Sequence, residues 1–119
     1  FVAPGTVMCT SAGTNGLNVE VTRSIEAALR ETGLTLRTVP SPGAIFAPDG
    51  APLPATYCNF YIANEAVVMP LFGIPEDSEA HDEIAAAFPS RAIVGLPARD
   101  LLWGGGAFHC ATQPQPEAP

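Results

Sequence analysis

The chain of 119 residues contains no lysine, and its five arginines face twelve aspartate and glutamate residues, a formal net charge of −7 at pH 7. Because proteins that bind nucleic acid neutralise phosphates with a basic surface, this composition argues against a nucleic-acid partner. Charged residues make up only 14% of the chain, against about 25% in an average soluble domain. We therefore expect part of the surface to face protein, either more of the same chain or a partner. The acidic balance also suits a small cationic substrate.

Cysteine is scarce as well. Cys9, Cys58 and Cys110 are odd in number and widely spaced, so they do not form a disulfide framework. No CxxC pair and no Cys/His spacing indicates a zinc site, and we expect neither a metal nor an organic cofactor. Free thiols are typical of the reducing cytoplasm, which we predict as the location.

Long apolar runs are missing too. No stretch approaches the roughly 20 residues that cross a bilayer. The first residues lack the basic segment and apolar run of a secretory signal, so we expect no membrane partner. The chain does not begin with methionine. It starts in an apolar, strand-like segment, as a fragment or processed chain would.

The first part of the chain, residues 1–39, has the pattern of a β–α–β unit. Residues 6–10 are β-prone and residues 34–39 alternate, so each predicts a strand. An apolar stripe predicts a helix over 19–31, with Asn18 as its cap and Gly33 at its end. Residues 11–16 predict a turn-rich loop. Residues 40–56 are rich in proline and glycine and predict a longer loop that separates the two halves.

The second part, residues 57–113, predicts a ββαβ module followed by one more strand. Residues 57–62 and 66–70 indicate a hairpin; Asn64 suits its turn, whereas Glu65 tolerates a positive φ poorly. A helix is expected over about 78–88, then strands over 91–96 and 107–112. Residues 114–119 predict a mobile tail. The fold class is therefore α/β or α+β, with strand, helix and strand recurring in both halves.

Three glycines, Gly104, Gly105 and Gly106, lead into the last predicted strand, which carries Cys110. Glycine lets backbone approach a ligand closely, and a thiolate is the strongest side-chain nucleophile near neutral pH. Cys110 is thus the candidate nucleophile, with the three glycines as candidate substrate-binding residues. The alternatives are a buried strand cysteine and a plain tight turn. A phosphate loop is excluded because its lysine is absent.

The remaining polar candidates have simpler explanations. His109 should face away from Cys110, because neighbours on a strand point to opposite sides, and His81 is expected on a solvated helix face. We expect Asp100 to be a solvated loop acid or turn former, with binding of a cationic substrate as the alternative. We expect turn or strand roles for Asn59 and Asn64, a core, interface or pocket role for Trp103, and small core positions in strands for Cys9 and Cys58. The sequence has no third histidine, so a proton carrier is not visible.

Three segments, residues 59–64, 67–73 and 104–113, together resemble the C-terminal part of agmatine deiminases, which are related to the bacterial-type peptidylarginine deiminases. The resemblance covers nearly the whole chain and is densest from residue 57 to residue 115. It implies the pentein fold, a propeller of ββαβ modules around a central site, of which this chain would be a partial domain. Its partners would be the remaining N-terminal modules or another chain. The sequence departs from the family at Ala107, usually asparagine, and at Glu65, usually glycine.

The resemblance also implies a reaction, the hydrolysis of the guanidinium of agmatine to N-carbamoylputrescine and ammonia in putrescine biosynthesis. Cys110 occupies the position of the nucleophile that forms the covalent amidino-cysteine intermediate, and no cofactor is required. The family's histidine and guanidinium-binding acids lie in earlier modules. We therefore predict that the isolated 119-residue chain does not turn over agmatine.

Two alternatives remain open. A peptidylarginine deiminase of the same superfamily would act on arginine in peptides, and the segment around Cys110 does not separate it from an agmatine deiminase. A non-catalytic module would instead assemble through its open strand edges, because unpaired edges invite pairing. Self-association into a homo-oligomer is also left open.

Overall fold

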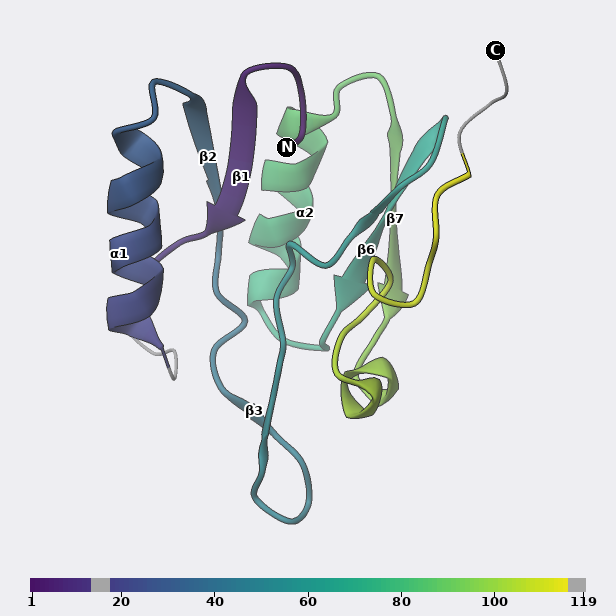
Figure 1. Cartoon of the computed structure of the whole chain (residues 1–119). Helices are drawn as coiled ribbons and strands as arrows, with labels where there is room; N and C mark the ends of the chain where they lie inside the picture. Colours follow the sequence, from purple (N-terminus) through teal and green to yellow (C-terminus); the bar gives the residue numbers. More distant parts are fainter. Residues whose placement is uncertain (14–17, 116–119) are drawn as a thin grey trace.

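The computed structural model describes residues 1–13 and 18–115, and it contains both strands and helices (Figure 1). Five strands follow one another between the two α-helices. In chain order the elements are β1 (Thr6–Thr10), α1 (Val19–Arg30), β2 (Thr35–Val39), β3 (Ile45–Phe46), β4 (Pro52–Leu53), β5 (Tyr61–Ile62), β6 (Ala66–Leu71), α2 (Glu76–Ala87), β7 (Ala92–Pro97) and the 3₁₀ helix η1 (Asp100–Gly104). The mixed α/β composition that the sequence predicts is thus present.

The first half is the predicted β–α–β unit. β1 and β2 pair in parallel, with Thr6 opposite Thr35 and Thr10 opposite Val39, and α1 provides the crossover that parallel strands require. Gly33 has a φ of +74°, which ends the helix in a conformation that favours glycine. The expected cap is wrong in one respect, because the side chain of Asn18 makes no capping hydrogen bond.

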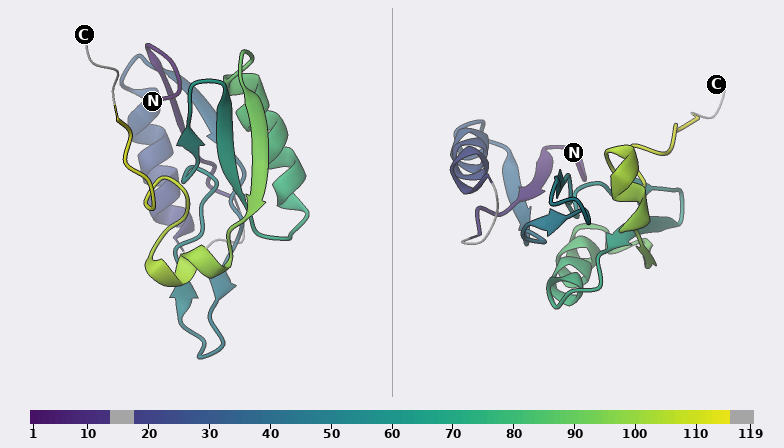
Figure 2. Two further views of the ribbon diagram at one scale, coloured as in Figure 1. Left: turned by 90° about the vertical axis from the view of Figure 1, so that its right-hand side faces the viewer. Right: turned by 90° about the horizontal axis from the view of Figure 1, so that it is seen from below.

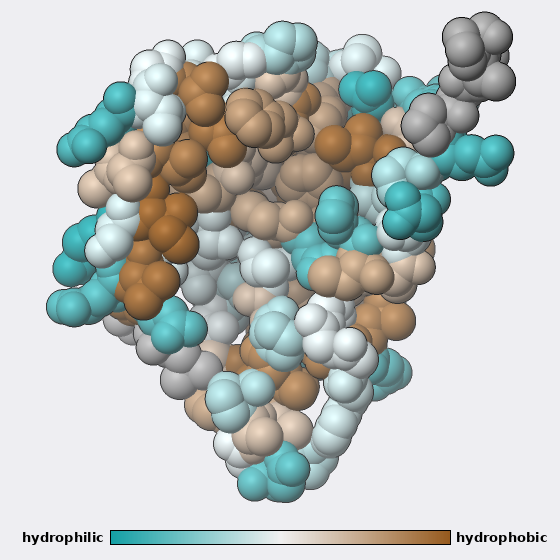
Figure 3. All heavy atoms as spheres, viewed as in Figure 1, coloured by the Kyte–Doolittle hydropathy of each residue, from teal (hydrophilic) through white to brown (hydrophobic). Residues whose placement is uncertain are grey.

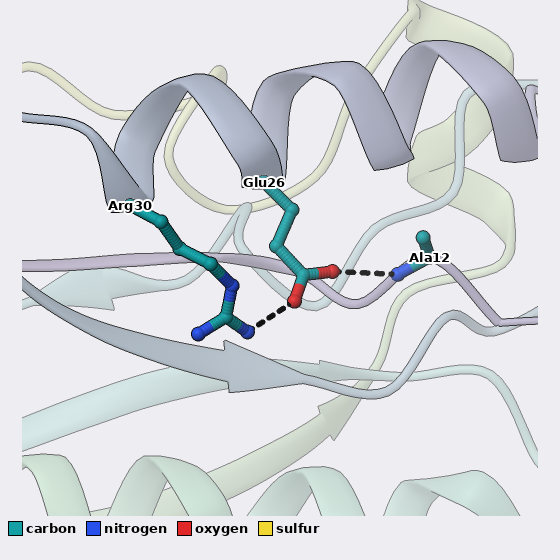
Figure 4. A network of polar contacts seen from close by, with 3 residues as sticks. All are labelled: Ala12, Glu26 and Arg30. Atoms are coloured by element: carbon teal, nitrogen blue, oxygen red, sulfur yellow. Dashed lines mark hydrogen bonds and ion pairs between the residues drawn. The ribbon is translucent and has the colours of Figure 1, made fainter.

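The loop after β1 is fixed to α1 through Glu26 (Figure 4). One carboxylate oxygen of Glu26 accepts the amide of Ala12 at 3.4 Å, and the other pairs with Arg30 one turn further along α1. α1 nevertheless has no buried residue, and Val21 and Ile25 are 57% and 49% exposed. Apolar side chains gather accordingly on the α1 side of the surface in Figure 3. Because an amphipathic helix is stabilised mainly by burial of its apolar face, α1 contributes little to the core.

The segment 40–56, predicted as a loop, contains a small hairpin. Ile45 and Phe46 of β3 pair antiparallel with Leu53 and Pro52 of β4. A two-residue strand is too short to show the alternation of apolar and polar residues that predicts a strand. The prolines of this segment also disfavour a strand prediction.

The second half is a ββαβ module. β5 and β6 are antiparallel, β6 and β7 are parallel, and the strand order is β5–β6–β7. α2 begins at Glu76, two residues before the predicted start, and crosses from β6 to β7. The first predicted strand, 57–62, is shortened to β5, because residues 57–58 form a turn. The described residues show no positive φ outside glycine, so Glu65 sits in its turn without strain.

The core lies mainly between α2 and the strands that it packs against. α2 contacts β2 of the first sheet and β7 of the three-stranded sheet, and the left view of Figure 2 shows it beside β7. The largest fully buried side chains include Tyr57, Phe72, Met69, Ile84 and Leu102. These belong to the second half or to η1, so the apolar interior is built around the ββαβ module and supports the segment that follows it.

The last predicted strand, 107–112, is not a strand. After η1 the chain turns at Gly105, whose φ is +92°, and two of the amides that follow form local hydrogen bonds. The amide of Ala111 donates to the carbonyl of Ala107, and the amide of Thr112 donates to that of His109. Donors used locally are not available to a strand ladder, so this segment forms successive turns.

The predicted tail is only partly within the described residues: Pro114 and Gln115 are exposed and irregular, and residues 116–119 lie outside the described residues, as does part of the expected loop 11–16. Within the described ranges, no helix has both the length and the apolar character to cross a membrane.

Candidate functional site

Cys110 lies on the turns that follow the glycine run, and its side chain is exposed. Its sulfur borders a cavity of about 160 Å³ lined also by Leu101, Gly104, Gly106, Ala107 and Ala111. A nucleophile needs access to its substrate, and this arrangement provides it. The alternative of a cysteine buried in a strand does not describe this side chain.

Asn59 holds Cys110 from the other half of the ββαβ module. Its side-chain amide donates to the sulfur at 3.1 Å, and its side-chain oxygen accepts the backbone amide of Cys110 at 3.1 Å. Its backbone carbonyl also accepts the amide of His109 at 3.2 Å. Sequence reasoning gave Asn59 only a turn or ladder role and missed its contact with Cys110, because nothing in the sequence links residues 51 positions apart.

The three glycines of the run have different surroundings. A Cβ on Gly106 would lie 2.5 Å from the sulfur of Cys110 and 3.1 Å from the side-chain nitrogen of Asn59, so no side chain fits there. Gly104 lines the cavity but has open space around it. Gly105 turns the chain with its positive φ and is not among the cavity-lining residues. Gly106 therefore gives the sulfur room, whereas Gly105 directs the backbone.

The two histidines lie apart from the sulfur. His109 lines a different cavity, with Phe1, Met8 and Cys58 among its other walls. The expectation that His109 faces away from Cys110 therefore fits the structure, although the reason given for it was wrong, because the segment is not a strand. His81 is exposed on α2 and contacts Asp82 at 3.3 Å. Among the residues that the structure describes, no imidazole or carboxylate forms a hydrogen bond with the Cys110 sulfur.

The other cysteines are less accessible. Burial raises the pKa of Cys9, with smaller contributions from neighbouring Cys58 and Glu26. Burial also raises the pKa of Cys58, more than hydrogen bonds with Thr10 and Thr56 lower it. Cys9 lies in β1, as predicted, but Cys58 lies in a turn. A thiol with a raised pKa is a poorer nucleophile at neutral pH, so neither rivals Cys110.

Asp100 and Trp103 do not border the Cys110 cavity. Asp100 begins η1 and is exposed, and Trp103 is 60% exposed. Ala107, where the resembling family usually has asparagine, is 1% exposed and packs in the core. The site therefore has a positioned thiol, a hydrogen-bond donor beside it and open space in front of it. That arrangement can form a covalent bond with an electrophilic carbon.

The chain is similar to a known protein family and to several individual proteins. The sequence profile of the Porphyromonas-type peptidyl-arginine deiminase family matches residues 1–116. A Latilactobacillus sakei protein named "Putative agmatine deiminase" is 48% identical over 67 residues, which are 56% of this chain and 18% of that protein. The chain matches about a fifth of the length of such curated relatives.

Solved structures agree over a larger part of the chain. The C. jejuni agmatine deiminase is 26% identical, with a TM-score of 0.71, over 91% of this chain and 32% of its own. The agmatine deiminase of Enterococcus faecalis, 23% identical with a TM-score of 0.81 over 92% of this chain and 36% of its own, shares the fold. The chain thus corresponds to about a third of these structures, and it belongs to the Porphyromonas-type peptidyl-arginine deiminase family.

Proposed function

We propose that this chain carries the nucleophile of an amidine C–N hydrolase that converts agmatine to N-carbamoylputrescine and ammonia. The observation that supports the proposal is the placement of Cys110. Its side chain is exposed, its sulfur accepts a hydrogen bond from the side-chain amide of Asn59 at 3.1 Å, and the residue lines a cavity. Relatives and structural neighbours named agmatine deiminase favour agmatine as the substrate. One of those structures is a cysteine-to-serine variant of the C. jejuni enzyme with substrate bound.

The proposed chemistry is covalent catalysis by Cys110. Its thiolate attacks the guanidinium carbon and forms a C–S bond; the C–N bond then breaks, and ammonia leaves after taking up a proton. Water attacks the resulting amidino carbon, the C–S bond breaks with its electrons returning to sulfur, and the product leaves. The first half consumes one proton and the second releases two, so a proton carrier is required.

The proton carrier and the acidic groups that hold the guanidinium are proposed to come from residues outside this chain. A planar guanidinium is held best by carboxylates through paired hydrogen bonds, and among the residues that the structure describes, none that lines the Cys110 cavity is acidic. His109 and His81, the two histidines of the sequence, do not line it either. The isolated 119-residue chain should therefore release no ammonia from agmatine. Ammonia release by that chain alone would contradict this part of the proposal.

A haloamidine tests the nucleophile directly, because 2-chloroacetamidine mimics the guanidinium and alkylates a thiolate beside it. The protein at its full natural length is treated with the reagent, and the labelling of each cysteine is measured by mass spectrometry. We expect Cys110 to react at least about tenfold faster than Cys9 and Cys58, whose pKa values are raised by burial. The C110S variant should lose the rapid labelling, and the C58S variant should keep it. Equal labelling of all three cysteines would favour a non-catalytic module instead.

A peptidylarginine deiminase is the second candidate, favoured by the matching family profile. The two enzymes differ in whether the guanidinium arrives on a free small molecule or on a peptide. Comparing kcat/KM for free agmatine with that for a peptide ending in arginine separates them. A preference for agmatine supports the leading proposal, and a preference for the peptide contradicts it.

A further inference from the structure

The turn of residues 56–59 contacts three separate parts of the molecule. Its backbone closes through a hydrogen bond from the amide of Asn59 to the carbonyl of Thr56. The hydroxyl of Thr56 lies 3.0 Å from that of Thr10, at the end of β1. Asn59 reaches Cys110, as described above. The remaining anchor is Tyr57, which enters the core between these two contacts.

Tyr57 is fully buried, with 0% of its surface exposed. Its ring packs against Phe72, with the ring centroids 5.1 Å apart and the planes tilted by 51°. Its hydroxyl donates to Oδ1 of Asp77 at 2.7 Å. A buried hydroxyl without a partner is costly, so this single acceptor fixes the side chain in one position.

Asp77 is itself held in place. Its Oδ1 also accepts the amide of Phe72 at 3.0 Å, and its Oδ2 accepts the amides of Gly73 at 2.8 Å and Ile74 at 3.3 Å. These donors come from the loop between β6 and α2, so the carboxylate is part of a rigid junction. A hydroxyl bound to such a group has little freedom to move.

The two contacts lie two residues apart in the same turn. Tyr57 is fixed by Asp77 on one side, and Asn59 holds the sulfur of Cys110 on the other. A shift of the turn would move the side-chain amide of Asn59 away from the sulfur. Hydrogen bonds weaken steeply when the donor angle falls below about 120°, so a rotation of the turn would weaken this contact.

We propose that Tyr57 is a positioning residue, whose hydroxyl, held by Asp77, fixes the turn from which Asn59 orients the sulfur of Cys110. This inference rests on the proposed function, because it assumes that Cys110 is the reacting group. Tyr57 does not touch the substrate in this proposal. It acts through Asn59, and its effect should therefore appear in the reactivity of the sulfur and in kcat more than in substrate binding.

The test uses the natural-length protein and the Tyr57→Phe variant, which removes only the hydroxyl. We expect the rate of Cys110 labelling by 2-chloroacetamidine to fall about fivefold or more. The kcat for agmatine should fall to a similar extent, with KM within twofold of its original value. The matched control is Ile84→Val, a core substitution on α2 away from the turn, which lowers stability but should leave the labelling rate within twofold.

A double-mutant cycle tests the contact itself. Asp77→Ala removes the acceptor and should reduce labelling by about as much as Tyr57→Phe, and the double variant should show no further fall. Asp77→Asn keeps Oδ1 as an acceptor for the Tyr57 hydroxyl. The labelling rate of Cys110 should therefore fall less in Asp77→Asn than in Asp77→Ala. If Tyr57→Phe does not fold, the comparison of Asp77→Asn with Asp77→Ala gives the same test.

The outcomes separate this inference from the function on which it rests. Fast, selective labelling of Cys110 in the original protein, with an unchanged rate in Tyr57→Phe, overturns the positioning role and leaves the proposed nucleophile intact. If Ile84→Val lowers the labelling rate of Cys110 as much as Tyr57→Phe does, the positioning role is also overturned, because the effect would then reflect a general loss of stability. No selective labelling in the original protein overturns both.

Discussion

The side-chain amide of Asn59 lies 3.1 Å from the sulfur of Cys110, and the side-chain oxygen of the same residue accepts the Cys110 amide at 3.1 Å. One asparagine therefore fixes both the side chain and the backbone of the proposed nucleophile. The contact joins the turn before β5 to the turns after η1, at opposite ends of the ββαβ module. This module consequently brings its own first and last segments together at the site.

Replacing Asn59 with alanine should slow the labelling of Cys110 by 2-chloroacetamidine by about tenfold or more. A typical hydrogen bond contributes about 0.5–1.5 kcal/mol, and this variant loses two, one to the sulfur and one from the backbone amide of Cys110. Asn64→Ala is the matched control, because Asn64 is exposed in the β5–β6 turn. Labelling rates of both variants, measured by mass spectrometry, decide the matter. Equal rates would remove Asn59 from the site.

Replacing Gly106 with alanine should have a similarly large effect. The added Cβ would lie 2.5 Å from the sulfur and 2.7 Å from the Cβ of Cys110, so the cysteine must move. Gly104→Ala, whose Cβ would meet no atom within 4 Å, makes the same chemical change two residues away. We expect labelling to fall more than tenfold in the first variant and to stay within about twofold in the second, since only overpacking forces a shift. Equal effects of the two changes would contradict this steric explanation.

Asp77 should make the stability of the protein depend on pH. Burial acts to raise the pKa of Asp77, but hydrogen bonds from Phe72, Tyr57, Gly73 and Ile74 outweigh burial and lower it. A lowered pKa in the folded state means that the carboxylate stabilises the protein above the unfolded value of about 3.9. This contribution is lost as the pH falls through the folded value.

The Asp77→Asn variant makes that contribution measurable. The difference in unfolding free energy between the original protein and the variant should be constant from about pH 7 to pH 5 and should shrink below about pH 4. Urea unfolding at several pH values measures it. A difference that stays the same down to about pH 2 would show that the charge of Asp77 has no part in it.

Two isoleucines on helices provide a test of where the core lies. Ile84 on α2 is 0% exposed, whereas Ile25 on α1 is 49% exposed. Truncating a buried isoleucine to alanine costs about 2–5 kcal/mol through lost burial and the cavity left behind. We expect Ile84→Ala to fall in that range in the 119-residue chain and Ile25→Ala to cost less than about 1 kcal/mol. Urea unfolding compares them, and a larger loss for Ile25→Ala would mean that the α1 face is covered.

Regular elements could be predicted where a pattern continues over several residues. The strand at Thr6–Thr10 and the helix at Val19–Arg30 follow from β-prone and amphipathic sequence. The short hairpin of β3 and β4 could not be predicted in this way. The strand predicted over 107–112 was wrong for a different reason. The segment is apolar enough for a strand, but the amides of Ala111 and Thr112 donate within the segment and those of His109 and Cys110 donate to Asn59, so no strand ladder forms.

The candidate site was predictable only in part. The glycine run before Cys110 indicated a cysteine in a special backbone environment, and the family resemblance strengthened that interpretation. Nothing indicated which glycine matters, although the structure separates Gly106 from Gly104 by what each Cβ would touch. The contact of Tyr57 with Asp77 was equally hidden, because a buried tyrosine and a helix-start aspartate each have ordinary explanations alone.

The sequence by itself determined the order of the longer strands and helices, the position of Cys110 after a glycine run and the presence of only two histidines. These are properties of composition and of neighbouring residues, which local periodicity records. Only the tertiary structure decided that Asn59 reaches Cys110 and that the sulfur opens to a cavity. The physical reason is that the distance between remote segments depends on the whole path of the backbone, to which the packing of α2 against β2 and β7 contributes.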